Sequence, residues 1–84
     1  MHHVYILRST KNHEKIYIGV TANTDRRLKE HNDESKGYAK QYRPWKLMTS
    51  ISFEDEKLAK NFERYLKSGS GFAFLKKRFI PKLI

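Results

Sequence analysis

The chain has 84 residues, in which 18 Lys and Arg oppose nine Asp and Glu and give a formal net charge of +9 at pH 7. A chain of this length is expected to form a single domain over residues 1–84, with a limited core and no room for a separate recognition domain. The absence of cysteine excludes disulfides and zinc sites built on thiolates. No apolar run approaches the roughly 20 residues of a membrane-spanning helix, and no signal-peptide core is present. We therefore expect a cytoplasmic location and no membrane partner.

The excess of positive charge indicates a polyanionic partner. Nucleic acid fits this charge best, because contacts from Lys and Arg to phosphates release condensed counterions. A merely soluble basic protein and a protein that docks on an anionic membrane surface are the alternatives.

Two strands joined by a polar hairpin loop are predicted at the start of the chain. Residues 2–8 and 15–20 have the alternating pattern of half-buried strands. The even positions of both strands are expected to face the core, namely Val4, Ile6, Ile16 and Ile18. A pairing centred on Lys11 would then place Tyr5 directly opposite Tyr17 on the other face, since a slip by one residue would split the apolar set. Gly19 lies beside them and has no side chain to block the two phenols.

A helix, a loop and a third strand follow in the predicted order. Thr24 is expected to cap a helix that starts at Asp25 and runs to about Asn32. Residues 33–44 are polar and basic and form a loop, and residues 46–51 form the third strand.

Two helices complete the predicted fold. Ser52 and Asp55 resemble a capping box for a helix that runs to about Lys67. Its apolar residues recur at helical spacing, at Leu58, Phe62 and Leu66. Residues 68–71 interrupt this helix, and a short basic helix follows over residues 72–78. The order strand, strand, helix, strand, helix, helix predicts an α/β fold of the α+β type, with a three-stranded antiparallel sheet flanked by helices.

Two tyrosines and two basic residues are candidates for chemistry. Tyr5 and Tyr17 are either a cross-strand aromatic pair that packs the sheet or phenols that relay a proton to or from a water molecule. A phenol with the ordinary pKa of about 10 acts as a base only if a nearby cation lowers that pKa. Arg27 and His31 lie four residues apart and so share a helix face, where they either form a solvated basic surface or contact a phosphate.

Glu63 is the fifth candidate, and it lies beside the apolar stripe of the later helix. Such a Glu is either a solvated, ion-paired residue or a metal ligand. Mg²⁺ accepts a single carboxylate and keeps most of its waters, so one Glu suffices for a site of that kind. The chain has no dense cluster of carboxylates, which argues against a site for two metal ions.

Taken together, these residues resemble the GIY-YIG nuclease superfamily. The segment Tyr17-Ile18-Gly19 reproduces the second half of its signature, whereas His3-Val4-Tyr5 keeps the tyrosine of the first half but lacks the glycine. Arg27 falls where the family carries its essential arginine, and His31 and Glu63 fall on the family's histidine and metal-binding glutamate. The resemblance covers nearly the whole chain, and the segment from Leu66 to Arg78 looks like that of small stand-alone bacterial members of the superfamily.

The resemblance implies a metal-dependent endonuclease that hydrolyses phosphodiester bonds. Glu63 would hold one Mg²⁺, for which Mn²⁺ substitutes, and Tyr17 or Tyr5 would act as the base or position the water. Arg27 would stabilise the transition state and His31 would assist proton transfer. Many members also carry an asparagine after the last helix, and this chain has only Ser68, Ser70 and Lys76 in that region.

Two basic clusters are predicted to bind nucleic acid, DNA more than RNA. The first combines Lys36, Lys40, Arg43 and Lys46 with Tyr38, Tyr42 and Trp45, and the second is Lys76, Lys77 and Arg78. Basic residues alternating with aromatic rings suit single-stranded nucleic acid, although core packing is the preferred interpretation of Trp45. Contacts of this kind bind the backbone without reading sequence, which predicts low sequence specificity and a preference for single-stranded or branched structures.

Three other functions fit the same composition. A non-catalytic nucleic-acid-binding module would keep the basic surface without a working metal site. A scaffold domain would dock on an acidic protein. An accessory nuclease would need a protein partner to place it on a repair or recombination intermediate.

Overall fold

The computed structural model describes residues 1–33, 37 and 39–81. The elements in chain order are the strands β1 (His2–Ser9) and β2 (Ile16–Thr21), the helix α1 (Thr24–Asp33), the short 3-10 helix η1 (Lys40–Tyr42), the strand β3 (Trp45–Phe53) and the helices α2 (Glu56–Leu66) and α3 (Gly69–Arg78). They form a three-stranded antiparallel sheet in the order β2-β1-β3. The predicted fold class and element order are therefore confirmed. In the described part of the chain, no helix is long and apolar enough to cross a bilayer.

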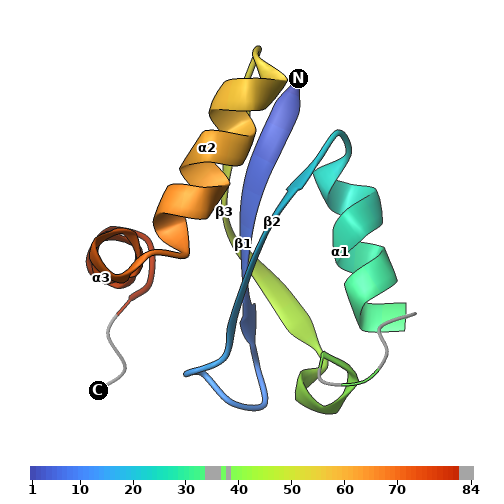
Figure 1. Ribbon diagram of the computed structural model, residues 1–84. Helices are drawn as coiled ribbons and strands as arrows, with labels where there is room; N and C mark the ends of the chain where they lie inside the picture. Colours follow the sequence, from blue (N-terminus) through green and yellow to red (C-terminus); the bar gives the residue numbers. More distant parts are fainter. Residues whose placement is uncertain (34–36, 38, 82–84) are drawn as a thin grey trace.

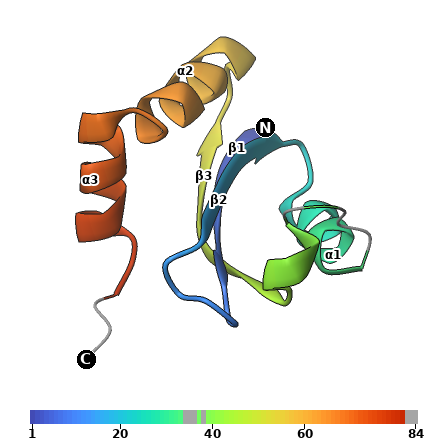
Figure 2. The same cartoon turned by 60° about the horizontal axis from the view of Figure 1, so that its bottom comes forward.

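The sheet lies between two layers of helices (Figures 1 and 2). Helix α1 covers one face, and α2 with α3 covers the other. The central strand β1 is consequently buried on both faces, while β2 forms an edge that passes between α1 and α2 in Figure 1. Side chains from both layers of helices can therefore border the same surface along β2.

Alternation along β1 and β2 divides the core into two clusters. The cluster under α2 and α3 is built on Val4, Ile6, Ile18, Ala59, Leu66 and Leu75, with Ile16 and Val20 packed against it. The cluster under α1 is built on Tyr5, Leu7 and Trp45. The prediction that the even positions of both strands share a core face is confirmed, and so is the prediction that Trp45 belongs to the core, since only 4% of it is exposed.

The predicted hairpin register is wrong by two residues. Tyr5 pairs with Gly19, and Tyr17 pairs with Leu7, so Tyr17 lies diagonally across from Tyr5 rather than opposite it. A shift of two residues keeps every side chain on its predicted face, because the period of a strand is two. The two phenols still lie side by side, with ring centroids 6.1 Å apart.

The helix starts differ from those expected. Asn23, not Thr24, caps α1, because its side-chain oxygen accepts the N–H of Arg26 at 3.0 Å. Asp55 caps α2 by accepting from the N–H groups of Lys57 and Leu58. The predicted cap Ser52 instead lies in β3 and its hydroxyl bonds the ring of His3 at 2.7 Å.

Two further expectations about α2 and α3 are corrected. Leu58 is 56% exposed and faces solvent, and Ala59 takes its place in the buried stripe. The chain does break between α2 and the next helix, as predicted, but residues 69–71 already form the first turn of α3, which Ser68 caps through the N–H of Gly71. Gly71 is required because an added Cβ would overlap the carbonyl oxygen of Tyr65, so the two helices pack with backbone against backbone.

Candidate active site at the edge of the sheet

Four of the five predicted site residues meet on the face of the sheet that α1 covers. Tyr5 comes from β1, Tyr17 from β2, and Arg27 and His31 from successive turns of α1. The hydroxyl of Tyr5 lies 3.2 Å from Nε2 of His31. The ring of His31 also meets the edge of the Tyr17 ring, at a centroid distance of 4.3 Å. The structure therefore brings the two phenols, the imidazole and the guanidinium into one cluster.

Gly19 creates the space for this cluster. An ideal Cβ at this position would overlap the Tyr5 hydroxyl and would lie 2.6 Å from Cζ and 2.8 Å from Cε1 of that ring. The Tyr5 phenol thus crosses over the backbone of β2 to reach α1. Only a residue without a side chain permits this approach.

The two tyrosines have different environments because their strands do. Tyr5 lies on the central strand and is 2% exposed, whereas Tyr17 lies on the edge strand and is 39% exposed. Burial raises the pKa of the Tyr5 phenol well above its ordinary value; the neighbouring Tyr17 raises it further and Arg27 opposes the shift. Tyr5 is therefore protonated at neutral pH, and Tyr17 is the phenol that is open to solvent.

The Tyr5–His31 hydrogen bond joins two uncharged groups. Burial lowers the pKa of His31, as does the positive charge of Arg27, while Glu30 opposes the shift. Either tautomer of the neutral imidazole satisfies this bond: with the ring proton on Nδ1 the Tyr5 O–H donates to Nε2, and with the proton on Nε2 the ring donates to the phenol oxygen. The pair thus holds both side chains without a net charge.

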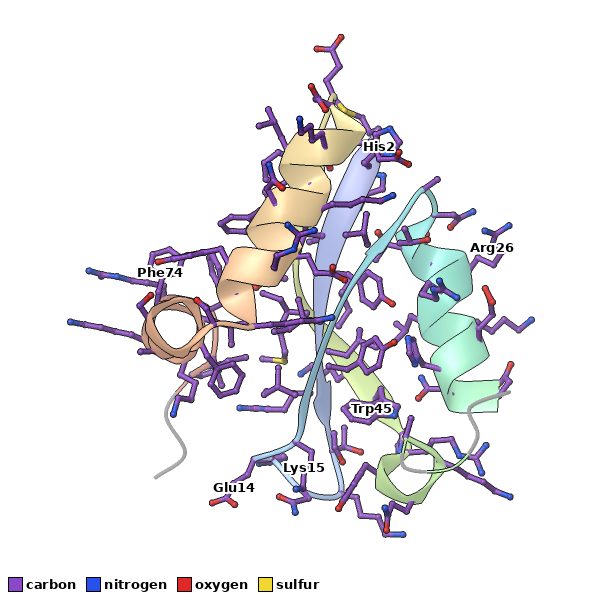
Figure 3. All side chains as sticks on the ribbon, viewed as in Figure 1. His2, Glu14, Lys15, Arg26, Trp45 and Phe74 are labelled. Atoms are coloured by element: carbon purple, nitrogen blue, oxygen red, sulfur yellow. The ribbon has the colours of Figure 1, made fainter. Side chains whose placement is uncertain are left out.

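Ion pairs along α1 hold Arg27 in place. Its guanidinium lies 3.8 Å from the carboxylate of Glu30, which also contacts Arg26 at 3.6 Å. Figure 3 shows Arg26 pointing outward from α1, away from the sheet. Arg27, by contrast, is near enough to Tyr5 to lower the pKa of that phenol. Arg27 is consequently the arginine of α1 that serves the cluster.

Glu63 comes from the other layer of helices. It lies on α2, its side chain is 25% exposed, and its carboxylate lies 3.5 Å from Nζ of Lys67. Lys67 in turn lines a hollow of about 300 Å³ together with Tyr17. Ile16, Ile18 and Phe72 complete its lining. Glu63 is thus paired with a lysine that lines the same hollow as Tyr17.

The donor set suits a cation that keeps most of its waters. Among residues 1–33, 37 and 39–81, no group of three or more His, Asp or Glu side chains is placed to surround an ion. The carboxylate of Glu63 is partly exposed and its partner is a mobile ammonium group rather than a fixed donor. A hydrated Mg²⁺ or Mn²⁺ held through this carboxylate fits these residues, whereas a chelating cage does not.

The predicted binding residues fall into two separate groups. Lys40 and Lys46 are exposed around η1 and the start of β3, whereas the guanidinium of Arg43 donates to the carbonyl of Asn32 at 3.1 Å and so also fastens the loop. The second group, Lys76, Lys77 and Arg78, is exposed in the last turn of α3. Lys36 and Tyr38 lie outside the described residues.

Trp45 and Tyr42 do not form an open stacking platform. The indole N–H of Trp45 donates to the carbonyl of Ala39 at 3.1 Å, and its ring packs against Tyr42 at a centroid distance of 6.5 Å. Figure 3 shows Trp45 beside the lower end of α1, on the side toward the sheet. These rings support the loop from within, so the expectation that they stack on bases is not supported for this pair.

Sequence reasoning missed two side chains that shape the site. The amide of Asn32 bonds both the N–H and the carbonyl of Trp45, and so ties the end of α1 to β3 one residue after His31. Lys67 was counted only as a helix end. Neither belongs to a sequence signal that we can name, because the partners of both are set by tertiary packing.

Comparison with known protein families agrees with this geometry. The family model described as the GIY-YIG catalytic domain matches residues 1–77. The chain is 44% identical over 66 residues to the structure-specific endonuclease subunit SLX1 of Podospora anserina, which covers 71% of this chain and 19% of that protein. It is 47% identical over 52 residues to slx1 of Aspergillus niger, a match that covers 56% of this chain and 12% of that protein. It is 37% identical over 71 residues to SLX1 of Debaryomyces hansenii, a match that covers 76% of this chain and 20% of that protein.

The relatives differ from this chain in length and from our expectation in origin. The chain spans a fifth of these relatives or less. They are fungal, so the expected likeness to small bacterial members is not supported. The match over residues 1–77 nevertheless covers all five candidate residues, and the chain belongs to the GIY-YIG catalytic-domain family.

Proposed function

We propose that this chain is a divalent-metal-dependent endonuclease domain that hydrolyses phosphodiester bonds, DNA before RNA, with low sequence specificity and a preference for branched or single-stranded structures. The observation that carries the proposal is the cluster of Tyr5, Tyr17, Arg27 and His31 on one face of the sheet, with Glu63 across the edge strand. The relatives named as structure-specific endonuclease subunits support the substrate class.

Each residue has a role that follows from its position. Tyr17 is the exposed phenol, and it orients the attacking water toward phosphorus and, as the general base, accepts the proton that this water loses. Arg27 donates to the phosphate oxygens, on which negative charge builds as the bond to the attacking water forms and the bond to the leaving oxygen breaks. Tyr5 and His31 are positioning residues: their neutral hydrogen bond fixes the ring against which Tyr17 packs.

Glu63 is the proposed metal ligand, and Mg²⁺ or Mn²⁺ is the ion that its single carboxylate suits. When bound, such an ion would supply a positive charge that stabilises the charge developing at the phosphate. The position of Glu63 across β2 from Tyr17 is compatible with a phosphodiester that lies over the edge strand and contacts both layers.

The preference for branched or single-stranded structures rests on the basic surface and on the relatives. The predicted binding residues that the structure describes lie in two separate groups, around η1 and at the end of α3, which suits backbone contacts rather than base reading. The word subunit in the names of the relatives also suggests a protein partner that places the domain on its substrate. Membership in a family of catalytic domains favours catalysis over a non-catalytic binding module.

The test is a cleavage assay with matched variants. End-labelled single-stranded, duplex and flap DNA, and a matched RNA, are incubated with Mg²⁺, Mn²⁺ or a chelator. We expect metal-dependent cutting of flap or single-stranded DNA. Arg27→Ala should lower the rate by about 10²–10³, the usual cost of removing a donor to the transition state, while Arg26→Ala, on the same helix with the same Glu30 partner, should not.

The proposed metal ligand has a control residue on the same helix. Glu63→Ala should abolish cutting, whereas Glu56→Ala, which removes a paired carboxylate two helical turns earlier, should leave it intact. Salt-sensitive binding without cutting under any condition would favour the binding-module interpretation. Equal cutting of plain duplex and flap DNA would remove the structural preference.

A further inference from the structure

The surface between Glu63 and Tyr17 holds a lysine to which the proposed function gives no role. Lys67 follows α2, and its backbone N–H donates to the carbonyls of Glu63 and Arg64 at 3.2 Å, which fixes the start of its side chain. Its ammonium group lies 3.5 Å from the Glu63 carboxylate, and 54% of the side chain is exposed. The same side chain lines the hollow that Tyr17 also lines. Lys67 therefore connects the proposed metal ligand Glu63 with that hollow.

The hollow has the chemistry of an anion subsite. Its described lining is three apolar residues, the Tyr17 phenol and the Lys67 ammonium, with no carboxylate among them. An ammonium on a flexible stem is a compact charge that suits phosphate. The exposed pair with Glu63 is weak and screened by salt, so a phosphate group competes for Lys67 at little cost.

We propose that Lys67 binds a phosphate of the substrate beside Tyr17, and that Glu63 holds its ammonium group until a divalent cation takes the carboxylate. The inference rests on the proposed function, because it takes the phosphodiester as the ligand of the hollow. The carboxylate of Glu63 has one negative charge to share, so the cation and Lys67 compete for it. Release of Lys67 by the cation then adds a positive charge where the substrate phosphate lies.

A second pair on α2 provides a matched control. Lys60 and Glu56 are also four residues apart, with Nζ and carboxylate 3.7 Å apart, and Glu56 lies in addition 3.8 Å from Nδ1 of His2. Each change at Glu63 or Lys67 can be paired with the same change of charge at Glu56 or Lys60. Effects of net charge appear in both pairs, whereas an effect of the hollow appears in one.

The first measurement is binding of a short single-stranded DNA in chelator, so that no metal is involved. Glu63→Gln should tighten binding severalfold more than Glu56→Gln, because it frees Lys67. Adding Lys67→Gln to Glu63→Gln should remove that gain and lower the salt slope by about 0.7, the value for one phosphate contact of a single strand. Circular dichroism checks that each variant is folded.

The second measurement is Mn²⁺ binding to the free protein, followed by electron paramagnetic resonance. Lys67→Gln should tighten Mn²⁺ binding by about twofold, since a competing exposed ion pair of this kind has about that strength, and Lys60→Gln should leave it unchanged. If both pairs behave alike in DNA and Mn²⁺ binding while the wild-type protein cuts DNA, the role of Lys67 is refuted and the proposed function stands. A wild-type protein that neither binds nor cuts DNA refutes both.

Discussion

Replacing Gly19 by alanine tests how tightly the site is built. The new methyl group would overlap the hydroxyl of Tyr5 and would lie 2.6 Å from its Cζ. Tyr5 has little room to yield, since it is 2% exposed, stacks on Tyr17 and is hydrogen-bonded to His31. The structure must either open the hairpin or rotate the phenol away from α1.

The expected cost is that of overpacking a filled core. Insertions of this size cost about 1–3 kcal/mol, and alanine recovers only a few tenths of that through its smaller backbone entropy. For a chain of 84 residues, a loss of about 2 kcal/mol lowers Tm by roughly 8–16 °C. The Tyr5–His31 bond should be lost in the same step, so cutting should also fall.

Urea unfolding followed by the fluorescence of Trp45 measures this cost. Gly69→Ala is the control, because nothing lies within 4 Å of its added Cβ and the position is the first turn of a helix, where alanine is neutral or stabilising. Tyr5→Phe in the Gly19→Ala background should recover part of the loss, since it removes the atom nearest to the new methyl. Equal stabilities of Gly19→Ala and Gly69→Ala would refute the packing argument.

Three further predictions follow from the same contacts. Gly71→Ala should destabilise the protein by more than Gly19→Ala in urea unfolding, because the obstacle is the backbone of Tyr65 rather than a side chain. The pKa of His31 is lowered in the folded protein, so the folded state binds fewer protons than the unfolded state as pH falls. The contribution of His31 to the free energy of unfolding is therefore complete above the ordinary pKa of about 6.5 and declines below it. His31→Asn should make the free energy of unfolding less dependent on pH between about pH 7.5 and pH 5. Tyr17→Phe should reduce the cleavage rate at least about tenfold without changing the unfolding free energy. Tyr5→Phe should cost about 1–2 kcal/mol of stability, because it removes one partner of the part-buried hydrogen bond with His31.

The two faces of the sheet were predictable because side chains of a strand alternate with a period of two. Val4, Ile6 and Ile18 identify the face under α2 and α3 for any strand register that differs by an even number of residues. For the same reason, this pattern cannot reveal a register error of two residues. The true register is set by the turn, where the hydroxyl of Ser9 accepts from the N–H groups of Lys11 and Asn12 and extends β1 beyond its predicted end. No apolar pattern records that bond.

The helix caps were mispredicted for a related reason. The segments before α1 and α2 each hold several residues that can cap a helix, and the choice between Asn23 and Thr24 depends on which residue the sheet leaves in extended backbone. The hydroxyl of Thr21 at the end of β2 bonds both the N–H and the carbonyl of Asn23. The strand end therefore places Asn23 at the cap, and the sequence alone does not show at which residue β2 ends.

The candidate site shows most clearly where sequence reasoning stops. Spacing identified Tyr5 and Tyr17 as a pair but treated them alike, because both lie on odd positions of amphipathic strands. The order β2-β1-β3 makes them unequal: β3 covers the far side of β1, so Tyr5 is enclosed and Tyr17 remains at the edge. Burial then keeps the Tyr5 phenol protonated, and its hydroxyl is held in the hydrogen bond with His31. A buried, protonated phenol cannot take a proton from a water molecule, so of the two tyrosines only the exposed Tyr17 suits the role that we propose for a phenol at the phosphodiester.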